Sequence, residues 1–147
     1  FTKLMPTIFM AGRILELPEP LVASIQGCAA VAVAVASYLV VRRNSDPIVW
    51  VAVVSLGTFL VSPYAYVYDM VIISVATLLL TLNSRQEDLL PFERIVLILL
   101  WMLPFLTIHL NMASIPVAPL ILSTGFVFIV IKGLRGQRTA SPRSLLR

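Results

Sequence analysis

The stretch SPYAYVYDM, residues 62 to 70, places a carboxylate inside the most apolar part of the chain. An acid at membrane depth is costly unless it is paired, so Asp69 is a candidate functional residue. Three tyrosines precede it at alternate positions. Tyr64 and Tyr68 are four residues apart, so we expect them to share one face of a helix, with Tyr66 pointing elsewhere.

Few other polar groups in the apolar runs can do chemistry. His109 is the only titratable residue of the last long apolar run, and Arg13 lies ahead of the first run. Each has a simpler interpretation. The tyrosines can form an aromatic belt at the membrane boundary, and His109 can be a neutral core residue bonded to a backbone carbonyl. Asp69 can hold two helices together by pairing with Arg13 or His109.

The composition indicates which elements must position these residues. Of the 147 residues, 59% are hydrophobic and 12% are charged, whereas soluble domains have roughly 45–50% apolar and about 25% charged residues. We therefore predict an all-α, polytopic bundle of membrane helices. No basic patch is interleaved with aromatics, so a nucleic-acid partner is not expected. Cys28 is the only cysteine, so we predict no internal disulfide, no metal site and no cofactor.

Three apolar runs set the number of spans. Residues 21–41 are uncharged and long enough for one helix across a core of about 30 Å. Residues 48–84 and 95–131 are each nearly twice that length, so each predicts a helical hairpin. The first should break at Ser62-Pro63, with the serine capping a helix that begins at the proline. The second should break near residues 111–116, which gives about five transmembrane helices.

Three further features complete the predicted layout. Pro104 and Pro119 should kink the helices of the second hairpin. Residues 2–17 predict a short interfacial helix, which is too charged to span. We divide the chain into a membrane part, 1–131, and a basic, disordered tail, 132–147.

The distribution of positive charge predicts the orientation. Nine lysines and arginines fall on the side of the first polar turn, the central loop and the tail. Only Lys3 and Arg13 fall on the side of the two hairpin tips. Because cytoplasmic loops carry the excess of basic residues, we predict a multi-pass plasma (inner) membrane protein with a cytoplasmic C-terminus. Asp69, His109 and Asn111 then lie at a similar level near the outer face.

Two sequence elements carry a family resemblance. Residues 62–71, SPYAYVYDMV, resemble the "SPY…YD" signature of glycosyltransferase family 87, whose members are polytopic GT-C enzymes. Residues 3–18, KLMPTIFMAGRILELP, look like the short stretch before a late transmembrane helix of that family. The order of features is similar over most of the 147 residues. The resemblance implies the C-terminal part of a longer enzyme, and the first residue, Phe1, fits this expectation.

The resemblance also implies an activity and a division of roles. Such enzymes move a hexose, here expected to be mannose, from a polyprenyl phosphate to an envelope glycolipid or glycan at the outer face. Asp69, Tyr64 and Tyr68 would line the sugar pocket, and Arg13 or His109 would hold the leaving phosphate. A groove near Pro104 and Pro119 would accept the polyprenyl chain. The family's catalytic acid lies in the first outer loop, which this chain lacks, so we expect the chain to be inactive without the missing N-terminal part.

Two other function classes stay open. A transporter or lipid flippase also uses an intramembrane acid and proline-broken helices, but it needs an ionisable group deep in the bilayer. A non-catalytic subunit of an envelope complex needs no site. In all three cases membrane lipids are expected partners.

Overall fold

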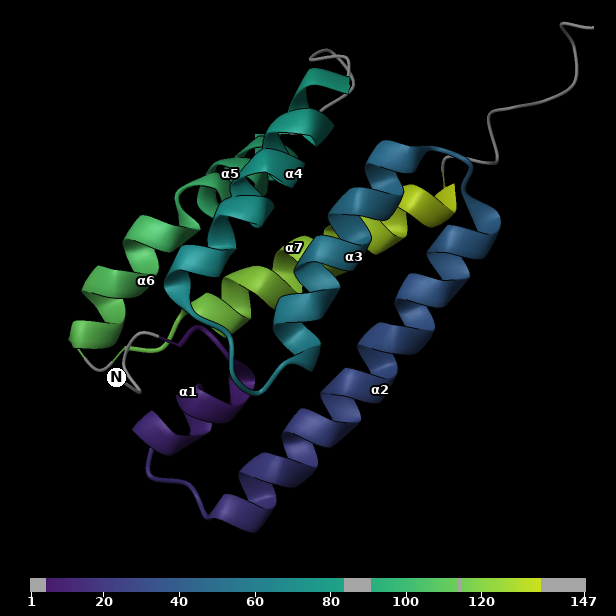
Figure 1. Ribbon diagram of the computed structural model, residues 1–147. Coiled ribbons are helices and arrows are strands. Elements are labelled where there is room, and N and C mark those ends of the chain that lie inside the picture. Colours follow the sequence, from purple (N-terminus) through teal and green to yellow (C-terminus); the bar gives the residue numbers. More distant parts are fainter. Residues whose placement is uncertain (1–4, 84–90, 114, 136–147) are drawn as a thin grey trace, which may run out of the picture.

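The computed structural model describes residues 5–83, 91–113 and 115–135, and this part of the chain is helical with no strand (Figure 1). The elements, in chain order, are α1 (Ile8–Ile14), α2 (Glu19–Arg43), α3 (Pro47–Val61), the 3-10 helix η2 (Val67–Met70), α4 (Val71–Asn83), α5 (Pro91–Trp101), α6 (Leu103–Met112) and α7 (Ala118–Arg135). The predicted all-α class and the short helix ahead of the first span are confirmed.

Two helices, α2 and α7, are long and apolar enough to cross a membrane, and α5 with α6 makes a third if this bent pair is one span. The α2 helix begins with a proline in its first turn and ends on Arg42 and Arg43, whose charges favour a helix C-terminus. The α3 helix and the η2–α4 segment are apolar but shorter. These helices support membrane association, whereas the five predicted spans exceed the two or three that length and composition give within residues 5–83, 91–113 and 115–135.

The first long apolar run breaks where the sequence predicted, but the residues at the break have other roles. Ser62 ends α3 instead of starting the next helix, because its N–H donates to the carbonyl of Thr58 at 2.9 Å. Residues 63–66 are not helical, and the next helix begins at Val67 with Tyr66 as its N-cap. The prediction that Tyr64 and Tyr68 share a helix face is therefore wrong, since Tyr64 precedes the helix.

The second long run also breaks in the predicted region, between α6 and α7. Pro104 lies in the first turn of α6, directly after a bend of 69° that separates α5 from α6, which confirms the predicted kink. Pro119 does not kink a helix, because it lies in the first turn of α7, where its missing N–H breaks no helical bond. The α7 helix continues to Arg135, so the start of the predicted disordered tail is helical, and residues 136–147 lie outside the described part.

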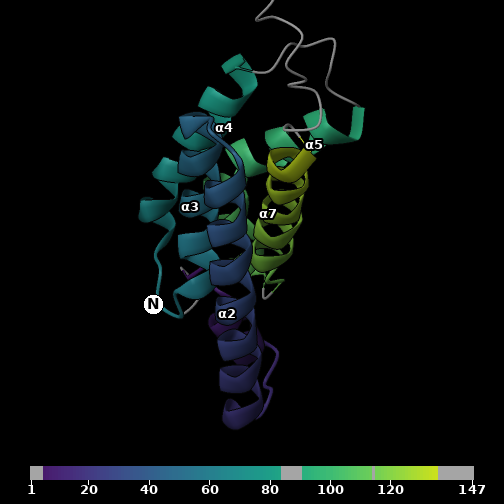
Figure 2. The same cartoon turned by 90° about the vertical axis from the view of Figure 1, so that its right-hand side faces the viewer.

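The core forms around α3, which packs on α2, α4 and α7. Figure 1 shows α2 along one edge of the bundle, and Figure 2, which faces that edge, shows α2 in front of α3 and α7. Two glycines of α7 allow close approach: Gly125 faces the side chain of Leu100 on α5, and Gly133 faces Val40 and Val49. Most of α2 faces outward, and only 17% of its most apolar stretch is buried. A surface this apolar is suited to lipid contact.

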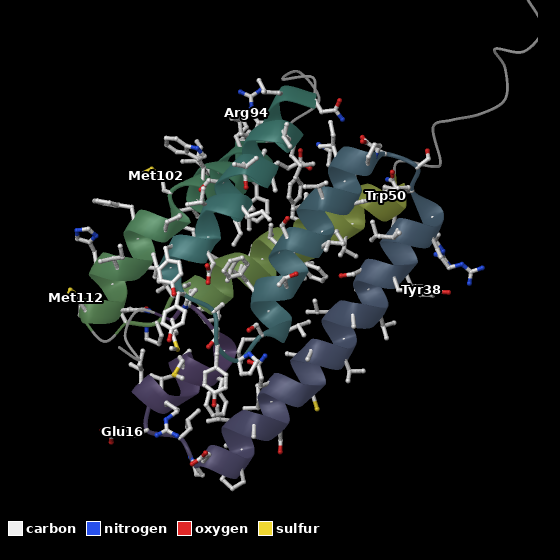
Figure 3. The ribbon with its side chains drawn as sticks, viewed as in Figure 1. Glu16, Tyr38, Trp50, Arg94, Met102 and Met112 are labelled. Carbon is white, nitrogen blue, oxygen red and sulfur yellow. The ribbon has the colours of Figure 1, made fainter. Side chains whose placement is uncertain are left out.

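Apart from Arg13 on α1, the basic residues of the described part lie at one end of the bundle: Arg42, Arg43, Lys132 and Arg135 in the last turns of α2 and α7, and Arg94 on α5 (Figure 3). The ends of α2 and α7 meet there, because Asn44 Nδ2 donates to the carbonyl of Gly133 at 2.8 Å. The end of α4 meets the start of α3 through the 2.9 Å bond from Asn83 Nδ2 to Asp46 Oδ2. We call this the basic end and the opposite one, which holds α1 and the connection 62–66, the connection end.

We predict that Gly125→Ala destabilises the bundle. A Cβ at this position would lie 2.6 Å from Leu100 Cδ1, and Leu100 is fully buried. Overpacking of this kind costs about 1–3 kcal/mol. The same change at Gly27, where a Cβ meets no atom within 4 Å, is the matched control and should leave stability equal or higher. Unfolding in detergent measures both, and equal stability of the two variants would contradict the packing.

Candidate functional site

The connection between α3 and η2 is fixed by short-range hydrogen bonds. Ser62 Oγ accepts the N–H of Tyr64 at 3.3 Å and donates to the carbonyl of Tyr64 at 3.1 Å. Asp69 Oδ2 then accepts the N–H of Tyr66 at 3.2 Å, and the N–H of Asp69 donates to the carbonyl of Tyr66 at 3.1 Å. Asp69 thus caps the start of its own helix, and one of its oxygens is engaged in that cap.

The carboxylate of Asp69 lies on the surface of the bundle. Within the described residues it makes no ion pair with Arg13 or His109, so the expected helix-joining pair is absent there. Arg13 pairs instead with Glu19 on α2, with 3.5 Å between Nη1 and Oε2. An exposed carboxylate with a second oxygen outside the cap can accept hydrogen bonds from a ligand.

The tyrosines are arranged differently from the prediction. Tyr66 and Tyr68 stack on one another, with ring centroids 5.2 Å apart and planes 7° apart. Tyr64 makes an edge contact with Phe9 of α1, with centroids 5.9 Å apart. Tyr64 and Tyr68 expose 62% and 70% of their surfaces. The connection therefore presents aromatic rings beside the carboxylate on a segment that backbone bonds hold in place.

His109 lies on α6. Of the interpretation as a core residue bonded to a backbone carbonyl, the carbonyl contact is confirmed. Its Nδ1 is 2.9 Å from the carbonyl of Phe105, and its ring packs on the Phe105 ring with centroids 4.2 Å apart. The side chain is exposed, however, so the prediction of a core residue is wrong. The α6 helix packs against η2, and Thr107 Oγ1 lies 3.9 Å from the Met70 sulfur. His109 and Asp69 thus lie on neighbouring elements without contacting each other.

A buried glutamine that the sequence analysis did not select joins three helices at the connection end. Gln26 Nε2 donates to the carbonyls of Leu60 and Val61, each at 2.9 Å, and its Oε1 accepts the N–H of Phe9 at 3.1 Å. The two carbonyls belong to the last turn of α3, where no helical partner exists for them. A single amide within 21 uncharged residues is the sequence signal that could have identified it, because such a group is unfavourable in apolar surroundings unless it is bonded.

A second bond attaches α1 to the connection. Thr7 Oγ1 accepts the N–H of Met10 at 3.2 Å, which caps α1, and donates to the carbonyl of Pro63 at 2.9 Å. Thr7 exposes 1% of its surface. Gln26 and Thr7 therefore hold α1 against the same segment that presents Asp69.

An apolar groove of about 370 Å³ opens beside α1. It lies between α1, the start of α2 and the segment that leads into α7. Its lining residues are Ile8, Ala11, Gly12, Leu15, Leu17, Val22, Ile25, Pro116, Pro119, Leu120 and Ser123. Pro119 lines the groove as the sequence analysis expected, whereas Pro104 does not. Arg13 follows Gly12 directly and is half-exposed, so a cation lies next to an apolar groove.

Asn111 at the end of α6 is buried, and its Oδ1 accepts no hydrogen bond among the described residues. Its backbone position near the second hairpin tip agrees with the prediction. An unpaired buried carbonyl is unfavourable by about 1–3 kcal/mol. The unpaired oxygen alone does not assign a chemical role to Asn111.

Comparison of the chain with protein-family models, with curated proteins and with solved structures found no match.

We predict that Gln26→Leu destabilises the connection end. The substitution leaves two carbonyls and one N–H without partners, and one buried unpaired group costs about 1–3 kcal/mol. The free energy of unfolding in detergent should fall, and trypsin should cleave faster after Arg13 because α1 loses an attachment. Ser24→Ala, which removes an exposed bond on the same helix, should change neither property. If Gln26→Leu behaves like Ser24→Ala, the amide does not hold the three helices together.

Proposed function

We propose that this chain is the C-terminal membrane part of a glycosyltransferase similar to family 87. It would help to transfer a hexose, with mannose as the first candidate, from a polyprenyl phosphate to an envelope glycolipid or glycan. One observation carries the proposal: the exposed carboxylate and tyrosines of the SPY…YD stretch lie at the same end of the bundle as the groove beside α1. This combination supplies a polar surface for a sugar and an apolar one for a lipid chain.

The proposal assigns each element a role. The groove holds part of the polyprenyl chain. Asp69 accepts hydrogen bonds from sugar hydroxyls through the oxygen outside its cap. Tyr64 and Tyr68 contact the sugar with exposed rings. The base that takes the acceptor proton comes from an outer loop in the missing N-terminal part.

Of Arg13 and His109, Arg13 is the better candidate for holding the leaving phosphate. It adjoins the groove, and its partner Glu19 is exposed, with 72% of the side-chain surface accessible. Exposed ion pairs are worth about 0–1 kcal/mol, so a phosphate can replace the carboxylate and be held bidentately. Neither residue lines the groove itself, but Arg13 follows the lining residue Gly12 on α1, whereas His109 lies on α6, which contributes no lining residue.

The proposal includes five spans, formed by α2, α3, η2–α4, α5–α6 and α7. Two properties of lipid bilayers support it. Short spans are accommodated by local thinning of the bilayer, and a proline-bent span is tolerated where neighbouring helices satisfy its backbone. The basic end would face the cytoplasm of the plasma membrane, and the connection end would face outward.

The transporter alternative finds less support in the described residues. Their buried polar side chains are Thr7, Gln26, Ser55, Thr77, Thr107 and Asn111, none of which titrates. A proton- or ion-coupled carrier commonly places an ionisable group at depth. If substitution of Asp69 leaves sugar transfer unchanged, a non-catalytic subunit becomes the favoured alternative.

We predict the sidedness of the bundle from the positive charge. In a Cys28→Ser background, Met112→Cys at the second tip should react with a membrane-impermeant maleimide in intact cells. Arg43→Cys at the basic end should react only after permeabilisation, because cytoplasmic segments carry the basic residues. Both original side chains are exposed in the bundle. The reverse pattern would invert the orientation and remove the site from the outer face.

We predict that Asp69→Asn lowers sugar transfer without unfolding the protein. The asparagine oxygen can still cap η2, whereas the charge that strengthens bonds to sugar hydroxyls is lost. Bonds to charged groups are worth about 1.5–3 kcal/mol, so transfer should fall roughly 10- to 100-fold. Membranes from cells that express the complete gene are assayed with polyprenyl-phosphate-linked mannose.

The matched control is Asp46→Asn at the basic end, because Asp46 also caps a helix, through its 2.9 Å bond from the N–H of Ile48. Transfer should be retained in this variant. Unchanged transfer by Asp69→Asn at normal expression would remove Asp69 from the site.

A further inference from the structure

A second groove, of about 330 Å³, lies between α4 and α5. Thr77 and Thr81 line it from α4, and Arg94, Leu97 and Trp101 line it from α5. Its volume falls within the range of about 300–1,000 Å³ that ligand sites occupy. Figure 3 shows Arg94 and Trp50 at the basic end, and Glu16 and Met112 at the other. The groove therefore begins at the basic end, away from the proposed sugar site.

The polar groups of this groove lie in a fixed order. The α4 helix runs toward the basic end and α5 runs away from it, and Ser74 Oγ donates to the carbonyl of Trp101 at 3.3 Å where the deep ends meet. Arg94 and Trp101 lie on one face of α5, seven residues or about 10 Å apart. Thr77, one turn deeper on α4 than Thr81, therefore lies between the levels of Arg94 and Trp101.

Thr77 shows that this groove is more than an apolar depression. Thr77 exposes 2% of its surface, and its Oγ1 has no hydrogen-bond partner among the residues that the structure describes. The neighbouring Thr81 does bond, because its Oγ1 donates to the carbonyl of Thr77 at 2.8 Å. A buried hydroxyl without a partner is unfavourable, so a ligand that supplies an acceptor there gains affinity.

We propose that this groove binds an anionic phospholipid of the membrane leaflet at the basic end. The phosphate lies at Arg94, whose guanidinium carries five donors and can serve a phosphate beside other partners. An ester carbonyl, which lies deeper in a phospholipid than its phosphate, accepts from the Thr77 hydroxyl. One acyl chain packs between α4 and α5 toward Trp101.

The order of chemistry along the groove favours a lipid over a protein segment. Along the groove, a cation is followed by a single hydrogen-bond donor and then by an apolar wall. These groups match the phosphate, the ester and the hydrocarbon chain of a phospholipid in the same order. Two further lining residues support this with outward-facing apolar surfaces, since Leu78 and Ile98 expose 50% and 60% of their areas. The inference needs membrane association but not sugar transfer, so it can fail or succeed independently of the proposed function.

The two tryptophans of the chain give a direct test with an internal control. Trp101 lies in the groove, while Trp50 lies on α3, where its Nε1 donates to the carbonyl of Asn44 at 2.6 Å. The chain is reconstituted in vesicles with brominated phosphatidylglycerol or brominated phosphatidylcholine, which quench tryptophan fluorescence on contact. Trp50→Phe leaves only the Trp101 signal, and Trp101→Phe leaves only the Trp50 signal.

We expect quenching of Trp101 to show a preference of about five-fold for the anionic lipid, which corresponds to about 1 kcal/mol per basic residue near a membrane surface. Trp50 should show a smaller preference. Arg94→Gln should reduce the Trp101 preference to that of Trp50. Ile98→Phe fills the groove without changing Arg94 and should weaken the quenching of Trp101 by both lipids. Thr77→Val should lower affinity for both while keeping the preference.

Equal preferences at the two tryptophans would overturn the proposal, as would an unchanged preference in Arg94→Gln. Absence of quenching at Trp101 would also overturn it, because a second copy or another protein segment would then cover the groove. If Arg94→Gln fails to fold, which Trp50 fluorescence and circular dichroism report, Ile98→Phe and Thr77→Val decide the question.

Discussion

Wherever a helix of this bundle is interrupted in apolar surroundings, its free backbone groups need partners from the protein itself. Gln26 meets this requirement at the end of α3, where its amide nitrogen donates to two carbonyls. Its amide oxygen accepts a backbone N–H of α1. Thr7, Ser62 and Asp69 satisfy the backbone groups of the segment that follows. The connection end has a defined shape because these side chains replace the bonds that continuous helices would have made.

The same requirement explains which predictions from the sequence were correct. The break of the first long run followed from length alone, since residues 48–84, whose only charge is Asp69, are too many for one helix. The bend before Pro104 followed from the missing N–H of proline. Apart from Arg13, the basic residues of the described part lie at one end because the polar turns that separate apolar runs alternate between the two ends of a helical bundle.

The incorrect predictions concern local capping and side-chain surroundings, which depend on contacts between distant residues. Ser62 looked like an N-cap because it precedes a proline, but the helix starts four residues later, where Asp69 satisfies the N–H of Tyr66. Pro119 lies in the first turn of α7 instead of bending it, which the predicted break near residues 111–116 already allowed. Gln26 was missed because its partners lie 17 to 35 residues away in the chain. For the site itself, the sequence identified residue types, whereas the stacking of Tyr66 on Tyr68 required the fold.

The long-range bonds of Gln26 also have a consequence for biosynthesis. At about 5–20 residues per second, the ribosome needs seconds to produce residues 60 and 61 after residue 26. Throughout this interval the α2 amide has no carbonyl of α3 to bind, and an unbonded amide is unfavourable in hydrocarbon. In the proposed arrangement of five spans, stable insertion of α2 would therefore be coupled to arrival of α3, and the two would enter the bilayer most favourably as a pair.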